Sequence, residues 1–198
     1  MPRPFARVLA VAAVLAIIAA GAALWTFFHV PSQQTTSSGT ATVGGPFTLV
    51  DQQGRTVTDE TFRGRWMLVF FGFTHCPDVC PTALNDMSAV LAELGAAADK
   101  VQPIFITVDP ERDTVEAMSQ YVANFDPRIV ALTGTPEQIA QAAKAYRVYY
   151  KKVPQGDDYT MDHTGILYLM DPQGRFMTHF TPNTPPADMA ARIRKLLG

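Results

Sequence analysis

The sequence predicts an α/β domain with a central mixed β-sheet flanked by helices, and an N-terminal transmembrane helix ahead of it. Three observations predict this arrangement. Strand and helix patterns alternate between residues 66 and 146, hairpin patterns lie on either side of that region, and a charge-free apolar run lies near the N-terminus. Alternating strands and helices favour parallel pairing, whereas hairpins add antiparallel strands, so a mixed sheet is expected.

The apolar run Val8–Phe28 predicts a membrane anchor. As a helix it would extend roughly 31 Å at about 1.5 Å per residue, which matches a hydrocarbon core of about 30 Å. A cleaved signal peptide is the alternative, because Arg3 and Arg7 precede the run and small residues near Ala22 could form a cleavage site. The length of the run favours an uncleaved anchor, and the basic residues at its start place the remaining chain outside the cytoplasm.

Three regions are therefore expected: a membrane anchor at 1–30, a flexible linker rich in Ser, Thr, Gln and Gly at 31–45, and a folded domain at 46–198. The only charges before Asp51 are Arg3 and Arg7, so the domain carries 16 − 2 = 14 basic and 18 acidic side chains, a net charge of 14 − 18 = −4. A mildly acidic domain without a basic run excludes nucleic acid as a partner. The hydrophobic content of 47% excludes a disordered chain.

The first half of the domain is predicted to hold a hairpin followed by a strand, a helix and a strand. The Asp51–Gly54 segment has turn chemistry between two short alternating segments, as in a hairpin. The run from Trp66 is almost continuously apolar, as expected for a central strand buried on both faces. Pro81 suits the first position of a helix. In chain order, the expected elements are strands at Phe47–Val50, Arg55–Thr58 and Trp66–Phe73, a helix from Pro81 up to Gly95, and a strand at Val101–Val108.

The second half is predicted to hold two more helices around a short strand, then a hairpin and a closing helix. Val108–Thr114 is interpreted as a strand end, a turn and a helix cap at Asp113 or Thr114. Thr135–Gln138 supplies an N-cap, a Pro at the first helical position and a capping-box partner. The expected elements are a helix from Thr114, a strand at Ile129–Leu132, a helix from Thr135 through Tyr146, paired strands at Ile166–Met170 and Phe176–Phe180, and a helix at Ala187–Leu197.

The chain has two cysteines, Cys76 and Cys80, and both lie between the expected central strand and its helix. In α/β sheets the crevice at the carboxyl ends of the strands is the usual binding site. The N-terminus of a helix favours thiolates, so both sulfurs are expected to be more acidic than in free cysteine. Side chains four residues apart can meet on one side of a helical turn, close enough for a disulfide or for a shared metal ion.

Spacing alone leaves several uses of the pair open. A purely structural disulfide is disfavoured, because so short a loop would contribute only about 2 kcal/mol. A dithiol reductase usually has two residues between its cysteines rather than three, whereas paired thiolates suit monovalent copper. A peroxidase is a weaker third reading, since Thr74-His75-Cys76 only loosely resembles the peroxiredoxin arrangement. The pattern thus favours a metal site, and a redox function of the cysteine pair stays open as the alternative.

A third metal ligand would have to come from another residue type, and a histidine is the obvious source. Each histidine, taken by itself, is more typical of a polar surface side chain than of a ligand. The acidic neighbours Asp78 and Asp162 are expected to be solvated carboxylates rather than ligands. The four histidines are His29 at the expected membrane boundary, His75 beside Cys76, His163 in a loop before the strand at Ile166, and His179 in the second hairpin.

Three separate strings, in this order along residues 46–198, resemble the Sco/SenC family. They are Gly72-Phe73-Thr74-His75-Cys76-Pro77-Asp78-Val79-Cys80-Pro81, then Val108-Asp109-Pro110-Glu111-Arg112-Asp113-Thr114, and then Asp162-His163-Thr164 followed by Tyr168-Leu169-Met170-Asp171-Pro172-Gln173-Gly174. Three matching strings in one order are far more specific than a lone cysteine pair. The N-terminal anchor is similar as well.

The resemblance implies a thioredoxin-like fold that binds copper, as Cu(I) and Cu(II), through Cys76, Cys80 and His163. It implies a metallochaperone that helps to assemble the dinuclear copper A centre of cytochrome c oxidase, with the copper A subunit, other copper chaperones and thiol reductants as partners. The expected location is the bacterial cytoplasmic membrane, crossed once, with the domain on the periplasmic side. The alternative function is a membrane-tethered thiol–disulfide oxidoreductase that uses Cys76 and Cys80 as its redox pair to reduce the target's copper-ligand cysteines.

Overall fold

The computed structural model describes residues 43–198. The predicted anchor at 1–30, its boundary residue His29 and most of the predicted linker lie outside the described residues. Within 43–198, no helix combines the length and the apolar character that crossing a membrane requires. The membrane anchor therefore stays a prediction from the sequence.

The centre of the domain is a seven-stranded mixed sheet with the order β2-β1-β5-β4-β3-β8-β9. Its strands are β1 (Thr48–Asp51), β2 (Thr56–Thr58), β3 (Trp66–Gly72), β4 (Val101–Thr107), β5 (Val130–Thr133), β8 (Leu167–Met170) and β9 (Phe176–Phe180). Strands β3, β4 and β5 pair in parallel, and the remaining pairs are antiparallel. The mixed sheet is confirmed, and β3 occupies the interior position that its apolar sequence predicts, between β4 and β8.

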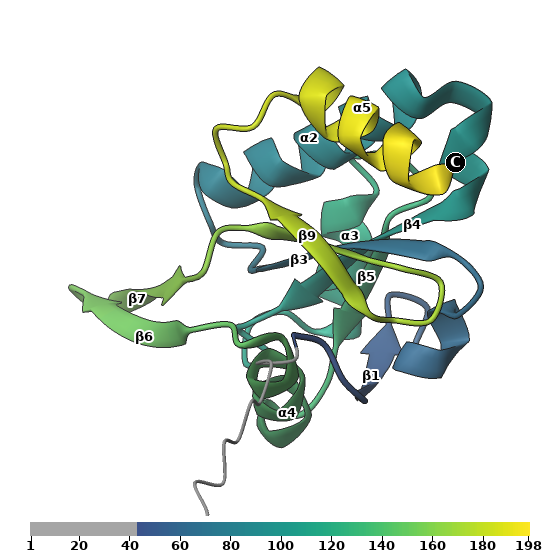
Figure 1. The fold of residues 1–198 in the computed structure, drawn as a ribbon. Helices are drawn as coiled ribbons and strands as arrows, with labels where there is room; N and C mark the ends of the chain where they lie inside the picture. Colours follow the sequence, from purple (N-terminus) through teal and green to yellow (C-terminus); the bar gives the residue numbers. More distant parts are fainter. Residues whose placement is uncertain (1–42) are drawn as a thin grey trace, which may run out of the picture. The chain divides into compact units, whose positions relative to one another are not determined.

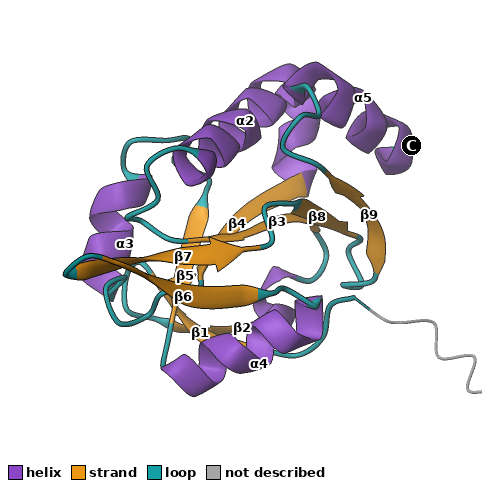
Figure 2. Ribbon diagram, turned by 90° about the vertical axis from the view of Figure 1, so that its left-hand side faces the viewer, coloured by secondary structure: helices purple, strands orange, loops and turns teal. Residues whose placement is uncertain are grey.

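Helices cover both faces of this sheet. Figures 1 and 2 show α2 and α5 side by side over one face and α4 over the opposite face. Within residues 43–198 the helices are α2 (Val79–Leu94), α3 (Val115–Val122), α4 (Pro136–Tyr146) and α5 (Pro186–Leu197), and the short 3-10 turns are η1 (Asp59–Phe62) and η2 (Gly95–Lys100). Buried side chains of β3, such as Phe70 and Phe71, fill the space between the layers.

Helix α2 begins two residues earlier than its predicted start at Pro81. The first backbone N–H groups of a helix have no intrahelical partner, so a proline within the first turn removes no hydrogen bond. Pro81 therefore marks the first turn and not the first residue. As a consequence, Cys80 belongs to the helix itself, while Cys76 lies in the preceding loop.

The sequence did not predict a second, two-stranded sheet formed by β6 (Tyr150–Gln155) and β7 (Asp158–His163). This hairpin extends away from the main sheet, as Figure 1 shows in green. Most of its side chains are exposed or only partly buried, so it lacks the alternating apolar pattern that identifies a strand. The expectation that His163 lies in a loop was wrong: it is the last residue of β7 and pairs with Tyr150.

Candidate metal centre

Two sulfurs and one imidazole converge at the carboxyl end of β3. The Sγ atoms of Cys76 and Cys80 and a ring nitrogen of His163 all lie within 4.8 Å of one another. Among residues 43–198, this is the only group of three or more His, Cys, Asp or Glu side chains so placed. The three residues come from different elements: the loop after β3, the first turn of α2, and the end of β7.

The end of β3 is shaped to receive the Cys80 sulfur. Cys80 is completely buried, and a Cβ placed on Gly72 would lie only 2.7 Å from its Sγ and 2.8 Å from the Phe70 ring. A residue with any side chain at position 72 would therefore displace the sulfur. The glycine at the last position of a buried strand thus lets the helix bring Cys80 down onto the sheet.

The sulfur of Cys76 occupies the place of a helix cap. Asp78, the residue before α2, makes no side-chain capping hydrogen bond, while the backbone N–H of Cys80 donates to Cys76 Sγ at 3.4 Å. A hydrogen bond from the Cys80 side chain, together with the backbone N–H groups of Asp78, Cys80 and Val79, lowers the pKa of Cys76 to about 5 against the effect of burial. Cys76 is therefore a thiolate at neutral pH.

Cys80 behaves in the opposite way. Its thiol donates a hydrogen bond to the Cys76 sulfur and is buried, and both effects raise its pKa above the ordinary value. The expectation that both sulfurs would be acidic was therefore wrong for Cys80. Two thiolates in contact repel each other, so only the sulfur nearer to the helix-terminal N–H groups ionises in the metal-free protein.

The acidity of Cys76 predicts an alkylation profile for the reduced, metal-free protein. Since the thiolate is the reactive form, the rate of reaction with iodoacetamide should be nearly constant between about pH 6 and 8 and fall about tenfold per pH unit below about 5. Peptide mass spectrometry should place the first label on Cys76. Replacing Cys80 with Ala removes the main cause of the shift and should move the midpoint upward; an unchanged midpoint would contradict this assignment.

His163 is oriented by its own neighbours. Its Nδ1 lies 3.1 Å from the carbonyl oxygen of Thr164, which can only accept a hydrogen bond, so Nδ1 carries the proton. The unprotonated Nε2 then faces Cys80 Sγ at 3.6 Å. Phe70 and Phe73 make edge contacts with the imidazole ring and limit its rotation. The nitrogen that can bind a metal therefore points at the sulfurs before any metal arrives.

This donor set suits copper. Two soft sulfur ligands and an imidazole are the combination that selects copper or zinc over magnesium or calcium, and they can hold monovalent copper in a trigonal arrangement. A metal ion would take the place of the Cys80 thiol proton, because a sulfur ligand must be a thiolate. The three side chains thus fit a copper ion with only small adjustments.

The other polar residues considered from the sequence do not join this group. His75 is exposed, and its Nδ1 lies 3.0 Å from the Thr74 hydroxyl. His179 is an exposed residue of the edge strand β9 and stacks on Phe176. Asp78 and Asp162 are exposed carboxylates, as expected.

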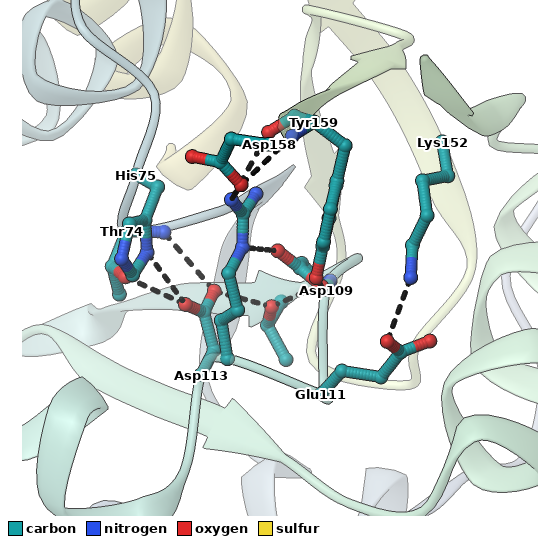
Figure 3. Close-up of polar contacts among 10 residues, drawn as sticks. Thr74, His75, Asp109, Glu111, Asp113, Lys152, Asp158 and Tyr159 are labelled. Atoms are coloured by element: carbon teal, nitrogen blue, oxygen red, sulfur yellow. Dashed lines mark hydrogen bonds and ion pairs between the residues drawn. The ribbon is translucent and has the colours of Figure 1, made fainter. Parts of the chain in front are cut away.

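The sequence interpretation missed the residues of the turn after β4 that support the site. Asp113 accepts hydrogen bonds from the backbone and the hydroxyl of Thr74 (Figure 3). Arg112 reaches the β6–β7 hairpin, where it donates to the backbone carbonyl of Tyr159. The string Val108–Thr114 was interpreted only as a turn and a cap, and Thr114 indeed caps α3. The signal that could have identified a supporting role is the density of charged residues directly after a buried strand.

Comparison with known proteins agrees with this description. The family model described as SCO1/SenC matches residues 35–198. The "Protein SCO1 homolog, mitochondrial" of Homo sapiens is 46% identical over 155 residues, which cover 76% of this chain and 52% of the human protein. The chain therefore spans about half the length of this curated relative.

Solved structures give the same result. The structure of Bradyrhizobium japonicum ScoI with copper bound is similar with a TM-score of 0.73 and 52% sequence identity, covering 77% of this chain and 98% of that chain. BsSco, described as a member of the Sco family of cytochrome c oxidase assembly proteins and as having a disulfide switch, is 26% identical with a TM-score of 0.64, covering 78% of this chain and 93% of that chain. The fold is the thioredoxin-like fold of the Sco proteins. On the match over most of its length, the chain belongs to the SCO1/SenC family.

Proposed function

We propose that this protein is a metallochaperone that binds copper through Cys76, Cys80 and His163 and delivers it to the copper A subunit of cytochrome c oxidase. The observation that carries the proposal is the convergence of two sulfurs and one imidazole nitrogen within 4.8 Å. Support comes from the copper bound in B. japonicum ScoI and from the description of BsSco as one of the oxidase assembly proteins. Copper is the cargo of such a protein, so the site has to release it as well as bind it.

The donor set accommodates both oxidation states of copper. The two sulfurs alone satisfy Cu(I), which accepts two ligands, whereas Cu(II) prefers more donors and gains from the imidazole. Because His163 comes from a separate hairpin, the site can add or remove its third ligand without moving the cysteines. The site is therefore expected to bind both Cu(I) and Cu(II).

A second function, thiol–disulfide exchange, is favoured by the acidity of Cys76. A half-buried thiolate could attack a disulfide of the oxidase subunit, forming a mixed disulfide and releasing one thiolate. Cys80 would then give up its proton and attack the Cys76 sulfur. The bond to the target sulfur breaks and that sulfur takes up the proton, giving a Cys76–Cys80 disulfide and a fully reduced target. Two electrons pass from this protein to the target, and the disulfide that remains cannot bind copper until another thiol reductant restores it.

The proposed location follows from the predicted membrane anchor and from the oxidase subunit that we propose as the partner. The curated relatives carry mitochondrial names. For this chain we place the anchor at residues 1–30, the linker at 31–45 and the domain at 46–198, with the domain on the periplasmic side of the bacterial cytoplasmic membrane. Other copper chaperones and thiol reductants are the proposed partners that load copper and restore the thiols.

A transfer experiment separates the two functions. Protein loaded with one Cu(I) should be mixed with the purified copper A domain of an oxidase, supplied with its cysteines either reduced or joined in a disulfide. A chaperone transfers copper to the reduced acceptor, and His163→Ala changes the yield of that transfer. Reduction of the oxidised acceptor by metal-free protein, with no copper transfer to the reduced acceptor, would instead identify the reductase.

A further inference from the structure

The geometry points to Arg112 as a positioning residue that, with Asp109, holds the β6–β7 hairpin against the domain and thereby keeps His163 opposite the two sulfurs. Arg112 touches none of the three proposed ligands and acts through the hairpin. This inference rests on the proposed copper site and adds to it a control over the third ligand. Figure 3 labels the partners of Arg112 in these contacts, Asp109, Asp158 and Tyr159.

Arg112 joins the turn after β4 to the hairpin by three kinds of contact. Its Nε donates to Asp109 Oδ2 at 2.5 Å, within its own turn. Its Nη1 donates to the backbone carbonyl of Tyr159 at 3.0 Å and to Asp158 Oδ1 at 3.2 Å, both in β7. Its guanidinium also lies 3.7 Å from the centre of the Tyr159 ring. A planar guanidinium can make all of these contacts at once, whereas a lysine ammonium cannot.

Asp109 contacts both Arg112 and Tyr159 and so completes the connection to the hairpin. It is 2% exposed, and its second carboxylate oxygen accepts the Tyr159 hydroxyl at 2.9 Å. A buried carboxylate is strongly disfavoured without partners, so Asp109 holds both Arg112 and Tyr159 in place. The three side chains therefore form a closed set of contacts rather than a single exposed ion pair.

This contact set lies on the face of β7 that carries His163. Tyr159, Met161 and His163 occupy alternate positions, so they share one face of the strand. Met161 on that face is buried in the hydrophobic core. Tyr159 is held at the outer end of the strand, and His163 is at the inner end. A strand rises about 3.3 Å per residue, so a tilt at Tyr159 would be transmitted over roughly 13 Å to the imidazole.

The adjacent residue holds the other half of the site. Asp113 is completely buried and accepts hydrogen bonds from Thr107 Oγ1 at 2.6 Å, from Thr74 Oγ1 at 2.6 Å and from Thr74 N at 3.0 Å. Thr74 lies in the loop that carries Cys76. One turn of the chain, Asp109–Asp113, therefore fixes the sulfur side through Asp113 and the imidazole side through Arg112.

The hairpin needs such support because a two-stranded sheet is only marginally stable on its own. Near the site, Tyr149 and Thr164 exchange backbone and side-chain hydrogen bonds across its base. Farther out, Lys152 forms an ion pair with Glu111, but these side chains are 42% and 61% exposed and so add little. This pair joins the same two segments as Arg112 does. Lys152 Nζ also lies 4.0 Å from the centre of the Tyr159 ring, so the matched control is Glu111→Gln, which removes the ion pair and leaves that ring contact in place.

Loosening the hairpin should affect the two copper states unequally. Cu(I) can remain on the two sulfurs, whose positions do not depend on Arg112. Cu(II) loses the imidazole whenever the hairpin tilts. Residues that orient metal ligands typically change metal affinity by about 10–100-fold when they are replaced. Arg112 is therefore expected to set the affinity for Cu(II) relative to that for Cu(I).

The test compares wild type with Arg112→Lys, Tyr159→Phe and Glu111→Gln. In the copper-free protein, amide hydrogen exchange of residues 150–163 should be faster in Arg112→Lys, faster to a smaller degree in Tyr159→Phe, and unchanged in Glu111→Gln. Competition titrations with chelators should show a loss of about 10–100-fold in Cu(II) affinity for Arg112→Lys and less than about threefold in Cu(I) affinity. Should Arg112→Lys fold poorly, Tyr159→Phe, which keeps the aromatic ring, is expected to change hairpin exchange and Cu(II) affinity in the same direction.

Several results would overturn the inference. Unchanged hairpin exchange in both Arg112→Lys and Tyr159→Phe would show that these contacts do not hold the hairpin. Equal losses of Cu(I) and Cu(II) affinity would indicate a general structural role. An effect of Glu111→Gln as large as that of Arg112→Lys would show that ion pairing between the two segments in general, and not Arg112 in particular, holds the hairpin. Absence of copper binding in wild type would refute the proposed function, whereas hydrogen exchange tests the hairpin without copper.

Discussion

Replacing Cys76 with Ser is expected to weaken copper binding in both oxidation states by roughly 100-fold or more. Metal–ligand sets contribute on the order of 10 kcal/mol, which is about 3 kcal/mol for each of three ligands, and each 1.4 kcal/mol is a factor of about ten. No other thiolate can take its place, because Cys76 and Cys80 are the only cysteines of the chain. Titration with Cu(I) in competition with a chelator of known affinity measures the loss.

Replacing Cys76 rather than Cys80 separates an effect on copper binding from an effect on folding. Cys76 is partly exposed, so a serine there leaves the core intact, whereas Cys80→Ser would bury a hydroxyl at a completely buried position and cost about 1–3 kcal/mol. Cys80→Ala serves as the second variant, with thermal unfolding of the metal-free forms as the control. Wild-type copper affinity in Cys76→Ser would remove this residue from the ligand set.

Replacing His163 with Ala is expected to weaken the binding of Cu(II) much more than that of Cu(I). The variant should keep substantial Cu(I) binding on its two sulfurs, while Cu(II) affinity falls by roughly 100-fold and the thiolate-to-copper absorption of the Cu(II) form disappears. Optical titration with Cu(II), beside a Cu(I) competition titration, makes the comparison. The reason is that the Nε2 of His163 is the only imidazole nitrogen grouped with the sulfurs among the described residues.

His179→Ala is the matched control, because His179 is an exposed histidine on β9 that lies outside this group. It should titrate like wild type in both states. If His163→Ala also titrates like wild type in both states, His163 is not a ligand. The acidity of Cys76 would then make thiol–disulfide exchange the better account of the cysteine pair.

The elements that the sequence predicted well are those with strong local signals. The helix α4 begins with the predicted capping box, in which Thr135 and Gln138 exchange hydrogen bonds. Both predicted hairpins of the main sheet are present, and their turns are alike. Asp51 and Asp171 each accept two backbone N–H groups from their own turn and pair with the arginine four residues on. Such signals act within a few residues, so they are readable without the fold.

The parts that the sequence could not predict depend on contacts between distant segments. The cysteine pair was found from its position after a buried strand, but the place of His163 followed only from a family resemblance. The hairpin that carries it gains its stability from Arg112 and Asp109, about fifty residues earlier, and not from an apolar pattern. The raised pKa of Cys80 likewise arises from burial and from the neighbouring sulfur, which its position near a helix N-terminus does not reveal.

If the protein hands on copper as proposed, the unequal burial of the two cysteines would give that transfer a direction. Cys80 is completely inaccessible, whereas Cys76 is partly exposed and is followed by exposed Pro77, Asp78 and Val79. His163 is partly exposed as well, so an incoming donor atom from another protein would approach a bound ion from the side of Cys76 and His163 and not from that of Cys80. In an associative exchange a ligand on this open side would leave first, and Cys80 would hold the ion until the incoming atom had bonded. Copper would then pass between proteins without becoming a free ion, and the bond to Cys80 would be the last to break.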